Sequence, residues 1–209
     1  EKSVLWLEFR IAGKHAHASR PDKGINAFRA ASWLVNLVDT GLRERFDRVD
    51  HLYEPSSSTF EPTLHSANVP NVNTIPPSDV FCFDCRVLPS YDVDSVLDYV
   101  QAQCRRVDGR YGTTTELIVR QRADAPPATS PTATVVRLLE RAIREVYAVS
   151  AKPMGIGGAT VASQFRKRRL DAAVWMTTRG TEHQVNEVCS IPNMVGDAKV
   201  FAHVYMSEF

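Results

Sequence analysis

The order of hydrophobic periods along the first 122 residues constrains the fold more than any other feature of this sequence. Side chains that alternate between apolar and polar predict half-buried strands, and apolar residues that recur every three or four positions predict amphipathic helices. In chain order these patterns predict a strand over 3–12, a helix over 25–42, strands over 59–67 and 80–88, a helix over 93–104 and a strand over 113–122. This order of strand, helix, strand, strand, helix, strand predicts a ferredoxin-like βαββαβ sandwich.

A proline fixes the place of one of these strands in the sheet. Pro62 lies inside the strand predicted over 59–67, and because proline has no N–H to donate to a ladder, it is tolerated at a sheet edge. The ferredoxin-like topology also puts its second strand at an edge. An open edge beside an amphipathic helix favours self-association. We therefore expect a homodimer formed through the helix over 24–42 and the edge strand over 59–67.

The pattern changes in a proline-rich stretch over 123–131, which predicts a domain crossing. We therefore expect a first domain over 1–124 and a second over 125–209. Helices and a strand alternate in the second domain, which is an α/β rhythm. Its roughly 80 residues are too few for a complete doubly wound domain, so we expect part of an α/β domain.

Local signals place the elements of this second domain. Ser130 and Pro131 have the chemistry of a helix cap and a first helical residue. A second helix is predicted to end near Arg169, and a strand is predicted over 172–176. A final helix would carry apolar side chains at Met194, Ala198, Phe201 and Tyr205.

Composition and charge exclude several classes of partner. The 25 basic and 24 acidic residues leave a formal charge of +1, so there is no overall attraction to nucleic acid or to an anionic membrane. No stretch approaches the roughly 20 apolar residues of a membrane span. We expect no secretory leader, because a strand-like pattern begins almost at once. Four cysteines in a chain of 209 residues do not indicate a disulfide scaffold. We expect no nucleic acid and no membrane partner, and a cytoplasmic location.

A loop with two histidines separates the first predicted strand from the first predicted helix. The spacing of Gly13, His17 and Pro21 resembles the lid-domain signature of the co-catalytic zinc deacylases and carboxypeptidases. This family includes succinyl-diaminopimelate desuccinylase, acetylornithine deacetylase, aminoacylase and glutamate carboxypeptidase. The resemblance implies that His17 reaches into the active site of a partner subunit and donates to the tetrahedral oxyanion. His15 is its nearest competitor, and the alternative for His17 is a solvated loop histidine.

A second motif lies before the last predicted helix. His183 is followed by Gln184, Val185, Asn186 and Glu187, which resembles the family's carboxy-terminal metal-ligand motif with valine in place of the usual proline. The resemblance implies that His183 binds zinc as a neutral imidazole. The family uses two zinc ions, for which cobalt can substitute.

Two further stretches resemble substrate-binding parts of the same family. Asn73 before an Ile-Pro pair, with Arg86 on the next strand, resembles the lid pair that holds the carboxylate of the substrate, and an arginine fork suits a carboxylate. The alternative for Arg86 is a surface ion pair with Asp84 of little energetic value. Gly157 and Gly158 are predicted to offer backbone N–H groups to an anionic substrate group before a helix, or else to form a tight turn for close packing.

The sequence lacks most of the family's catalytic set. No His-x-Asp segment and no Glu-Glu pair occurs, whereas the family needs both for its metal ligands and general base. The chain therefore resembles the lid plus the carboxy-terminal part of a zinc-peptidase catalytic domain. We expect it to belong to an enzyme that hydrolyses N-acyl amino acids or small peptides, and to be inactive and without retained zinc on its own.

Other readings come from different classes of protein. A ferredoxin-like dimerisation or binding module without catalysis would carry the same predicted elements. Cys82 and Cys85 form a C-x-x-C pattern that is found at zinc and redox sites, but three residues apart on a regular strand they point to opposite faces. The basic run over 166–169 could contact phosphate, or it could complement the dipole at the end of a helix.

Overall fold

A computed structural model describes residues 1–181 and 184–207 of the chain. The chain divides into two compact units. Unit 1 consists of Glu1–Ala125 together with Gly155–Ala159, and unit 2 consists of Pro126–Met154 and the residues from Thr160 onward.

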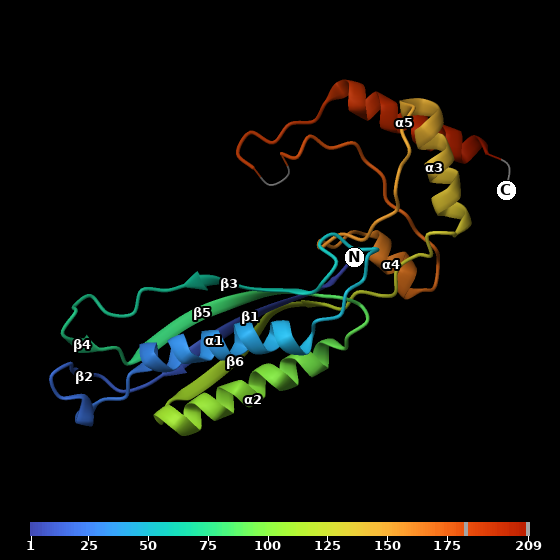
Figure 1. The fold of residues 1–209 in the computed structure, drawn as a ribbon. Coiled ribbons are helices and arrows are strands. Elements are labelled where there is room, and N and C mark those ends of the chain that lie inside the picture. The colour runs from blue at the N-terminus through green and yellow to red at the C-terminus, as the bar shows by residue number, and fades with distance from the viewer. Residues whose placement is uncertain (182–183, 208–209) are drawn as a thin grey trace. The chain divides into compact units, whose positions relative to one another are not determined.

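Unit 1 is a four-stranded antiparallel sheet covered on one face by two helices (Figure 1). The sheet has the order β3-β5-β1-β6, so the strand that carries Pro62 lies at an edge as predicted. The two helices and the four strands alternate as a ferredoxin-like sandwich requires, which confirms the predicted fold. The bounds are β1 Ser3–Ala12, α1 Ala27–Arg45, β3 Thr59–His65, β5 Ser78–Val87, α2 Val93–Tyr111 and β6 Thr114–Ala123.

Hydrophobic periodicity explains the core of unit 1. Leu5, Leu7 and Phe9 alternate along β1 toward the helices and are fully buried. Both helices begin at side-chain caps: Asn26 accepts from the N–H of Arg29, and Asp92 accepts from that of Asp94. One cluster of buried side chains joins three of the strands, β1, β3 and β5, to both helices, and half-buried Leu117 of β6 packs against it. The cluster consists of Leu5, Leu7, Phe9, Ile11, Ala27, Ala30, Ala31, Leu34, Val38, Leu42, Phe46, Phe60, Phe81, Phe83, Cys85, Val87, Val93, Val96, Val100, Cys104 and Val107.

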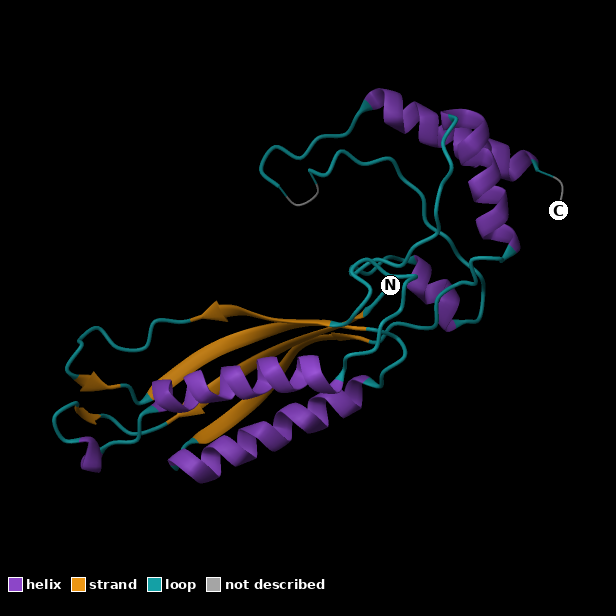
Figure 2. Ribbon diagram, viewed as in Figure 1, coloured by secondary structure: helices purple, strands orange, loops and turns teal. Residues whose placement is uncertain are grey.

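The opposite face of the sheet carries no helix of unit 1 (Figure 2). Glu8 is buried there between Arg10 and Arg120, with oxygen-to-nitrogen distances of 2.7 and 2.6 Å. Its hydrogen bonds with Arg120, and then with Arg10, hold the pKa of the Glu8 carboxyl below its usual value. Trp6 stands two residues earlier on the same face with 41% of its surface exposed.

The described residues of unit 2 form three helices, which are α3 Thr134–Tyr147, α4 Ala162–Lys167 and α5 Ile191–Met206. The prediction of a helix start at Ser130 and Pro131 was wrong by three residues. Ser130 Oγ instead accepts from the N–H of Thr132 in a turn, and α3 begins at Thr134.

The strand predicted over 172–176 is also absent from the described part of unit 2. Val174 and Met176 are more than half exposed and alternate with half-buried Trp175 and Thr177. The side-chain pattern of a strand is present, but no neighbouring strand pairs with it among the described residues. A strand without a partner cannot satisfy its backbone hydrogen bonds in a ladder.

The C-x-x-C pattern on β5 does not form a metal or redox site. Cys85 is fully buried in the core of unit 1, while Cys82 is half-buried on the other face. Burial raises the pKa of the Cys85 thiol to about 12, which keeps it protonated and unreactive. Within residues 1–181 and 184–207, no helix combines the length and apolar character needed to cross a bilayer.

Candidate functional site

Two short strands that the sequence analysis did not predict position His17. Ala16–His17 forms β2 and pairs antiparallel with β4, Thr74–Ile75. His17 lies opposite Thr74, and the N–H of Ala18 donates to the carbonyl of Asn73 at 2.8 Å. His17 and Asn73, which are 56 positions apart in the sequence, therefore lie side by side at one end of unit 1.

Gly13 is required for this arrangement. A Cβ atom there would lie 2.3 Å from the carbonyl oxygen of Ile25. The N–H of Gly13 donates to the carbonyl of Pro77 at 2.7 Å. The glycine of the sequence pattern thus permits a close approach of backbone segments at the base of the histidine loop.

The hydrogen bonds of His17 define which of its two ring nitrogens carries the proton. Nδ1 accepts from the backbone N–H of Ser19 at 3.2 Å and lies 2.8 Å from the Ser19 hydroxyl. Because a backbone N–H can only donate, Nδ1 is the acceptor, and the proton of the neutral ring is carried by Nε2. The side chain is exposed. His17 can therefore present an N–H donor to a group outside its own loop.

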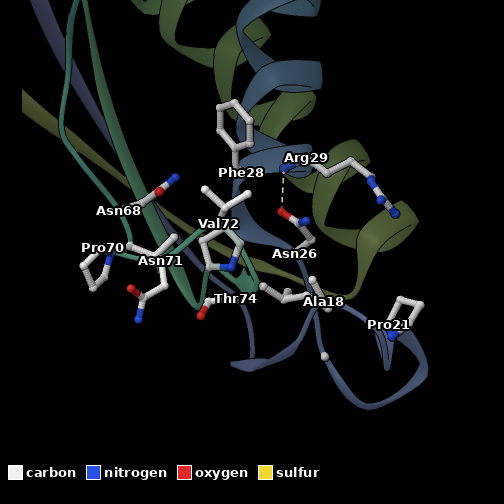
Figure 3. Close-up of a pocket in the computed structure, with 14 residues that line it drawn as sticks. Ala18, Pro21, Asn26, Phe28, Arg29, Asn68, Pro70, Asn71, Val72 and Thr74 are labelled. Atoms are coloured by element: carbon white, nitrogen blue, oxygen red, sulfur yellow. Dashed lines mark hydrogen bonds between the residues drawn. The ribbon is translucent and has the colours of Figure 1, made fainter.

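A hollow of about 420 Å³ adjoins this end of unit 1. Figure 3 shows that its labelled lining residues come from two segments, one around Ala18 to Arg29 and one around Asn68 to Thr74. Asn26 contributes to the wall and holds the first turn of α1 through its bond of 2.9 Å to the N–H of Arg29. The lining is mixed in polarity, and no cluster of titratable groups converges in it.

Arg86 lies at the other end of the sheet and is tightly held. Its Nε and Nη2 donate to the two carboxylate oxygens of Asp84 at 2.6 and 2.8 Å, and its Nη1 donates to the carbonyl of Gly157 at 3.1 Å. The Asp84 carboxylate raises the pKa of the guanidinium above its ordinary value. A guanidinium has five N–H donors. Two of them, one on each terminal nitrogen, have no acceptor among the residues that the structure describes.

The segment Gly155–Ala159 brings two of the predicted residues to Arg86. Gly155 pairs with the 52–54 segment, where its N–H donates to Leu52 and its carbonyl accepts from Glu54. A Cβ at Gly155 would lie 2.4 Å from the ring of Tyr53, whereas a Cβ at Gly157 would meet nothing within 4 Å. Gly155 is therefore the glycine needed for close packing. A Cβ at Gly157 would enter open space, and a Cβ at Gly158 would have only the end of the Ile156 side chain within 4 Å, at 3.9 Å.

The helix expected after these glycines is short. α4 contains six residues, and the N–H of its first residue, Ala162, donates to the hydroxyl of Thr160. The backbone of Gly157 and Gly158, rather than the helix end, is what the segment can offer to a ligand.

The structure does not bring Asn73 and Arg86 together in one chain. Ser78, close to Asn73 in sequence, pairs with Ala12 at one end of the sheet, and Arg86 pairs with Val4 near the other. Eight residues of antiparallel strand separate Ser78 from Arg86, which is roughly 27 Å at about 3.4 Å per residue. One small ligand therefore cannot touch Arg86 and the His17 end of the same subunit.

His183 lies outside the described residues. The residues after it form a turn, in which the N–H of Glu187 donates to the carbonyl of Gln184 at 3.2 Å and Asn186 has a φ of 65°. Asparagine is among the few residues that adopt this left-handed conformation readily. Among residues 1–181 and 184–207 no group of three or more His, Cys, Asp or Glu side chains could hold a metal ion.

A carboxylate that the sequence analysis missed fixes the base of this loop. Asp197 on α5 accepts from the Tyr147 hydroxyl at 2.8 Å, from Trp175 Nε1 at 3.0 Å, and from both the N–H and the hydroxyl of Thr177 at 2.8 and 2.7 Å. Burial alone would raise the pKa of Asp197, but these hydrogen bonds outweigh burial and lower it. Only three-dimensional contacts identify this residue, since no local motif surrounds it.

A groove of about 380 Å³ runs between α1 and the edge strand β3. Phe28 and Leu64 line it with about half of their surfaces exposed. His65 stacks on Phe28 with ring centroids 6.0 Å apart and lies 2.8 Å from a carboxylate oxygen of buried Asp79. The groove thus follows the helix and strand through which the sequence analysis predicted a homodimer.

Comparison with known proteins identifies the class. Residues 1–112 match the family model of the peptidase dimerisation domain of the M20 peptidases. The chain belongs to this family, and its curated relatives are metallohydrolases. An uncharacterized metallohydrolase of Methanocaldococcus jannaschii is 34% identical over 212 residues, and one of Methanococcus maripaludis is 34% identical over 220 residues. Both matches cover 98% of this chain and 52% of the relative, so the chain spans about half the length of these relatives.

Solved structures share the fold. The dipeptidase Dug1p of Saccharomyces cerevisiae aligns with a TM-score of 0.72 and 14% identity, over 97% of this chain and 53% of that one. A tripeptidase of Staphylococcus aureus aligns with a TM-score of 0.71 and 17% identity, over 97% of this chain and 50% of that one. A hydantoinase/carbamoylase family amidase of Burkholderia ambifaria aligns with a TM-score of 0.68 and 18% identity, over 97% and 46%.

Proposed function

We propose that this chain forms the dimerisation lid and the carboxy-terminal catalytic segment of an enzyme that hydrolyses the amide bond of N-acyl amino acids or small peptides. The observation that carries the proposal is the separation of two ligand-binding ends by the length of the sheet. His17 and Asn73 lie at one end, and Arg86 and Gly157 lie at the other. A site that needs all four residues must combine two copies of the chain.

The groove between α1 and β3 is the proposed surface for this pairing. In the described part of the chain no strand pairs with the outer side of the edge strand β3, and half-exposed Phe28 and Leu64 flank it. Pairing β3 with its copy would extend the sheet across a two-fold axis and cover these side chains. Such a dimer accounts for an open strand edge that a monomer would leave as an aggregation hazard.

Each end of the sheet has a distinct role in the proposed site. The two spare N–H donors of Arg86, with the backbone of Gly157 and Gly158, bind the carboxylate of the substrate. The partner's His17 then donates its Nε2 proton in a hydrogen bond to the oxyanion that develops on the scissile carbonyl, and the partner's Asn73 orients the substrate.

A metal, with zinc as the proposed ion and His183 as one ligand, completes the proposal. The described residues do not form a metal site by themselves, so the remaining ligands would come from the half of the relatives' length that this chain does not span. We expect the 209-residue chain to be inactive alone. Its four cysteines are all free, as a reducing cytoplasm would keep them.

Complementation between two inactive variants tests the shared site. In a polypeptide of the relatives' full length, His17→Ala and Arg86→Gln should each reduce hydrolysis of N-acyl amino acids by about 100-fold or more, since each removes a transition-state or substrate contact. Mixing equal amounts and allowing exchange should restore roughly a quarter of the wild-type activity, because half of the dimers are mixed and each contains one intact site.

The controls separate the dimer from the chemistry. Each variant mixed with itself should stay inactive. Failure of the mixture to regain activity, although sedimentation shows mixed dimers, would place all the site residues in one subunit and contradict the proposal. A wild-type protein that sediments as a monomer while hydrolysing the substrate would contradict it as well.

A further inference from the structure

Trp6 is a large aromatic side chain that lies outside the buried cluster of unit 1. It lies on the sheet face that the helices of unit 1 do not cover, with 41% of its surface exposed. Its neighbours two residues away on β1 are buried Val4 and the ion-paired Glu8. Among the residues that the structure describes, the Trp6 indole N–H has no hydrogen-bond acceptor.

The sheet register places Trp6 beside Arg86. Trp6 lies directly opposite Asp84 across the β1–β5 pair, so the two side chains stand on the same face. Arg86 is the diagonal neighbour of Trp6. Such neighbours are about 7 to 8 Å apart, a separation that aromatic and long side chains can bridge. Because the guanidinium binds both oxygens of Asp84, it is also drawn along its strand toward Trp6.

Three features therefore meet at one corner of unit 1: an arginine with two spare N–H donors, an open backbone segment at Gly157 and Gly158, and a half-exposed aromatic plate. The first two suit a carboxylate. The third suits an apolar group that is attached close to that carboxylate. The indole of Trp6 offers a broad apolar face, and it lies one neighbouring side chain away from Arg86.

We propose that Trp6 is a specificity residue that selects carboxylate ligands bearing an aromatic or large aliphatic side chain. The proposal rests on the role of Arg86 as the carboxylate anchor in the proposed function, and it names the class of substrate. N-acyl derivatives of phenylalanine and leucine are preferred over those of glycine or aspartate. An acidic side chain is disfavoured because it would lie between the indole and the carboxylate of Asp84.

The indole N–H resonances of the 209-residue chain provide a direct binding assay. The chain contains three tryptophans, so three resonances are expected, and Trp6→Phe identifies the one that belongs to Trp6. Titration with N-acetylphenylalanine should shift the Trp6 resonance and leave those of Trp33 and Trp175 in place. N-acetylglycine should bind about three- to tenfold more weakly, which is the range expected for one aromatic contact.

Variants separate the aromatic contact from the anchor. Trp6→Ala, followed by backbone amide shifts near Arg86, should remove the preference for N-acetylphenylalanine, and Trp6→Phe should retain most of it. Trp33→Ala is the matched control, because Trp33 is similarly exposed at 38% but lies on α1 under Arg110; it should change neither affinity. Arg86→Gln should abolish the binding of both ligands.

Each of the other possible outcomes contradicts one stated part of the proposal. If Arg86→Gln abolishes binding but Trp6→Ala leaves the preference intact, the specificity role of Trp6 is wrong and the anchor stands. If both ligands bind wild type equally well, Trp6 selects nothing. If neither ligand binds, or Arg86→Gln leaves binding unchanged, the anchor assigned in the proposed function fails and the role of Trp6 fails with it.

Discussion

The two units of this chain differ in how completely they bury their apolar side chains. In unit 1, one cluster of 21 buried side chains joins three of the four strands to both helices. In unit 2 the described cluster contains only Ala142, Ile143 and Val200. Many other apolar side chains of unit 2 are exposed, among them Val161 at 75% and Tyr205 at 84%.

From this difference we expect unit 1, and not unit 2, to be a domain in its own right. The sandwich of unit 1 closes on itself, since the apolar faces of its sheet and helices cover each other. The helices of unit 2 and the extended segment around Trp175 have apolar faces without a covering layer among the described residues. Exposed apolar surface on this scale marks a surface that packs against further protein. The curated relatives, at about twice the length, have further chain to supply it.

Separating the units should give the largest effect. A polypeptide of residues 1–125 should unfold cooperatively in denaturant, because it retains the whole buried cluster. A polypeptide of residues 126–209 should show no cooperative transition and should bind a hydrophobic dye. The few apolar side chains that it buries, Val136, Ala142, Ile143, Ala162 and Val200, cannot offset the entropy of ordering its backbone. Circular dichroism during urea titration measures both. A sharp transition for residues 126–209 alone would show that unit 2 is an independent domain.

The same difference explains what could be predicted from sequence. In unit 1 the strands and helices follow local periodicity, and Pro62 marks the edge strand, so the fold could be derived without contacts. In unit 2 the pattern over 172–176 is that of a strand, yet no strand forms. Periodicity reports which face a segment would bury, whereas strand formation also requires a partner.

The candidate site was predictable only where chemistry and backbone geometry coincide in a short motif. Gly13 and His17 share one loop, and the structure gives each a physical reason. Trp6 and Asp197 have no such signature. The position of Trp6 beside Arg86 depends on the register between β1 and β5. Asp197 is identified by hydrogen bonds to residues that are 20 to 50 positions away in the sequence. No periodic pattern carries that information.

A smaller effect should follow from adding a methyl group to the segment Gly155–Ala159, which belongs to unit 1 although part of unit 2 precedes it in the sequence. Gly155→Ala would place a Cβ 2.4 Å from the Tyr53 ring, and overpacking of this kind costs about 1 to 3 kcal/mol. Gly157→Ala is the matched control. It meets no atom within 4 Å, so the free energy of unfolding of unit 1 should change by less than about 0.5 kcal/mol. Equal losses for both variants would mean that the whole segment is closely packed.

The smallest expected effect is at Asp197, and it tests whether unit 2 has fixed tertiary structure. Because the folded-state pKa of Asp197 lies below its ordinary value, its stabilisation is complete above about pH 4, the unfolded value, and is lost as the pH falls through the lowered folded pKa. Asp197→Asn turns an amide N–H₂ toward donors such as the N–H of Thr177. This should cost about 1 kcal/mol at neutral pH and remove this part of the acid dependence.

The indole N–H resonance of Trp175, which bonds to Asp197 at 3.0 Å, reports this titration directly. Tyr147→Phe serves as the matched control. It removes one donor and leaves the carboxylate with Trp175 and Thr177, so the resonance should still titrate, with its midpoint shifted toward the ordinary carboxyl value. A Trp175 resonance whose chemical shift does not change with pH in wild type and in both variants would show that Asp197 does not fix this part of unit 2. The incompletely buried unit would then lack even the local order that these hydrogen bonds give it.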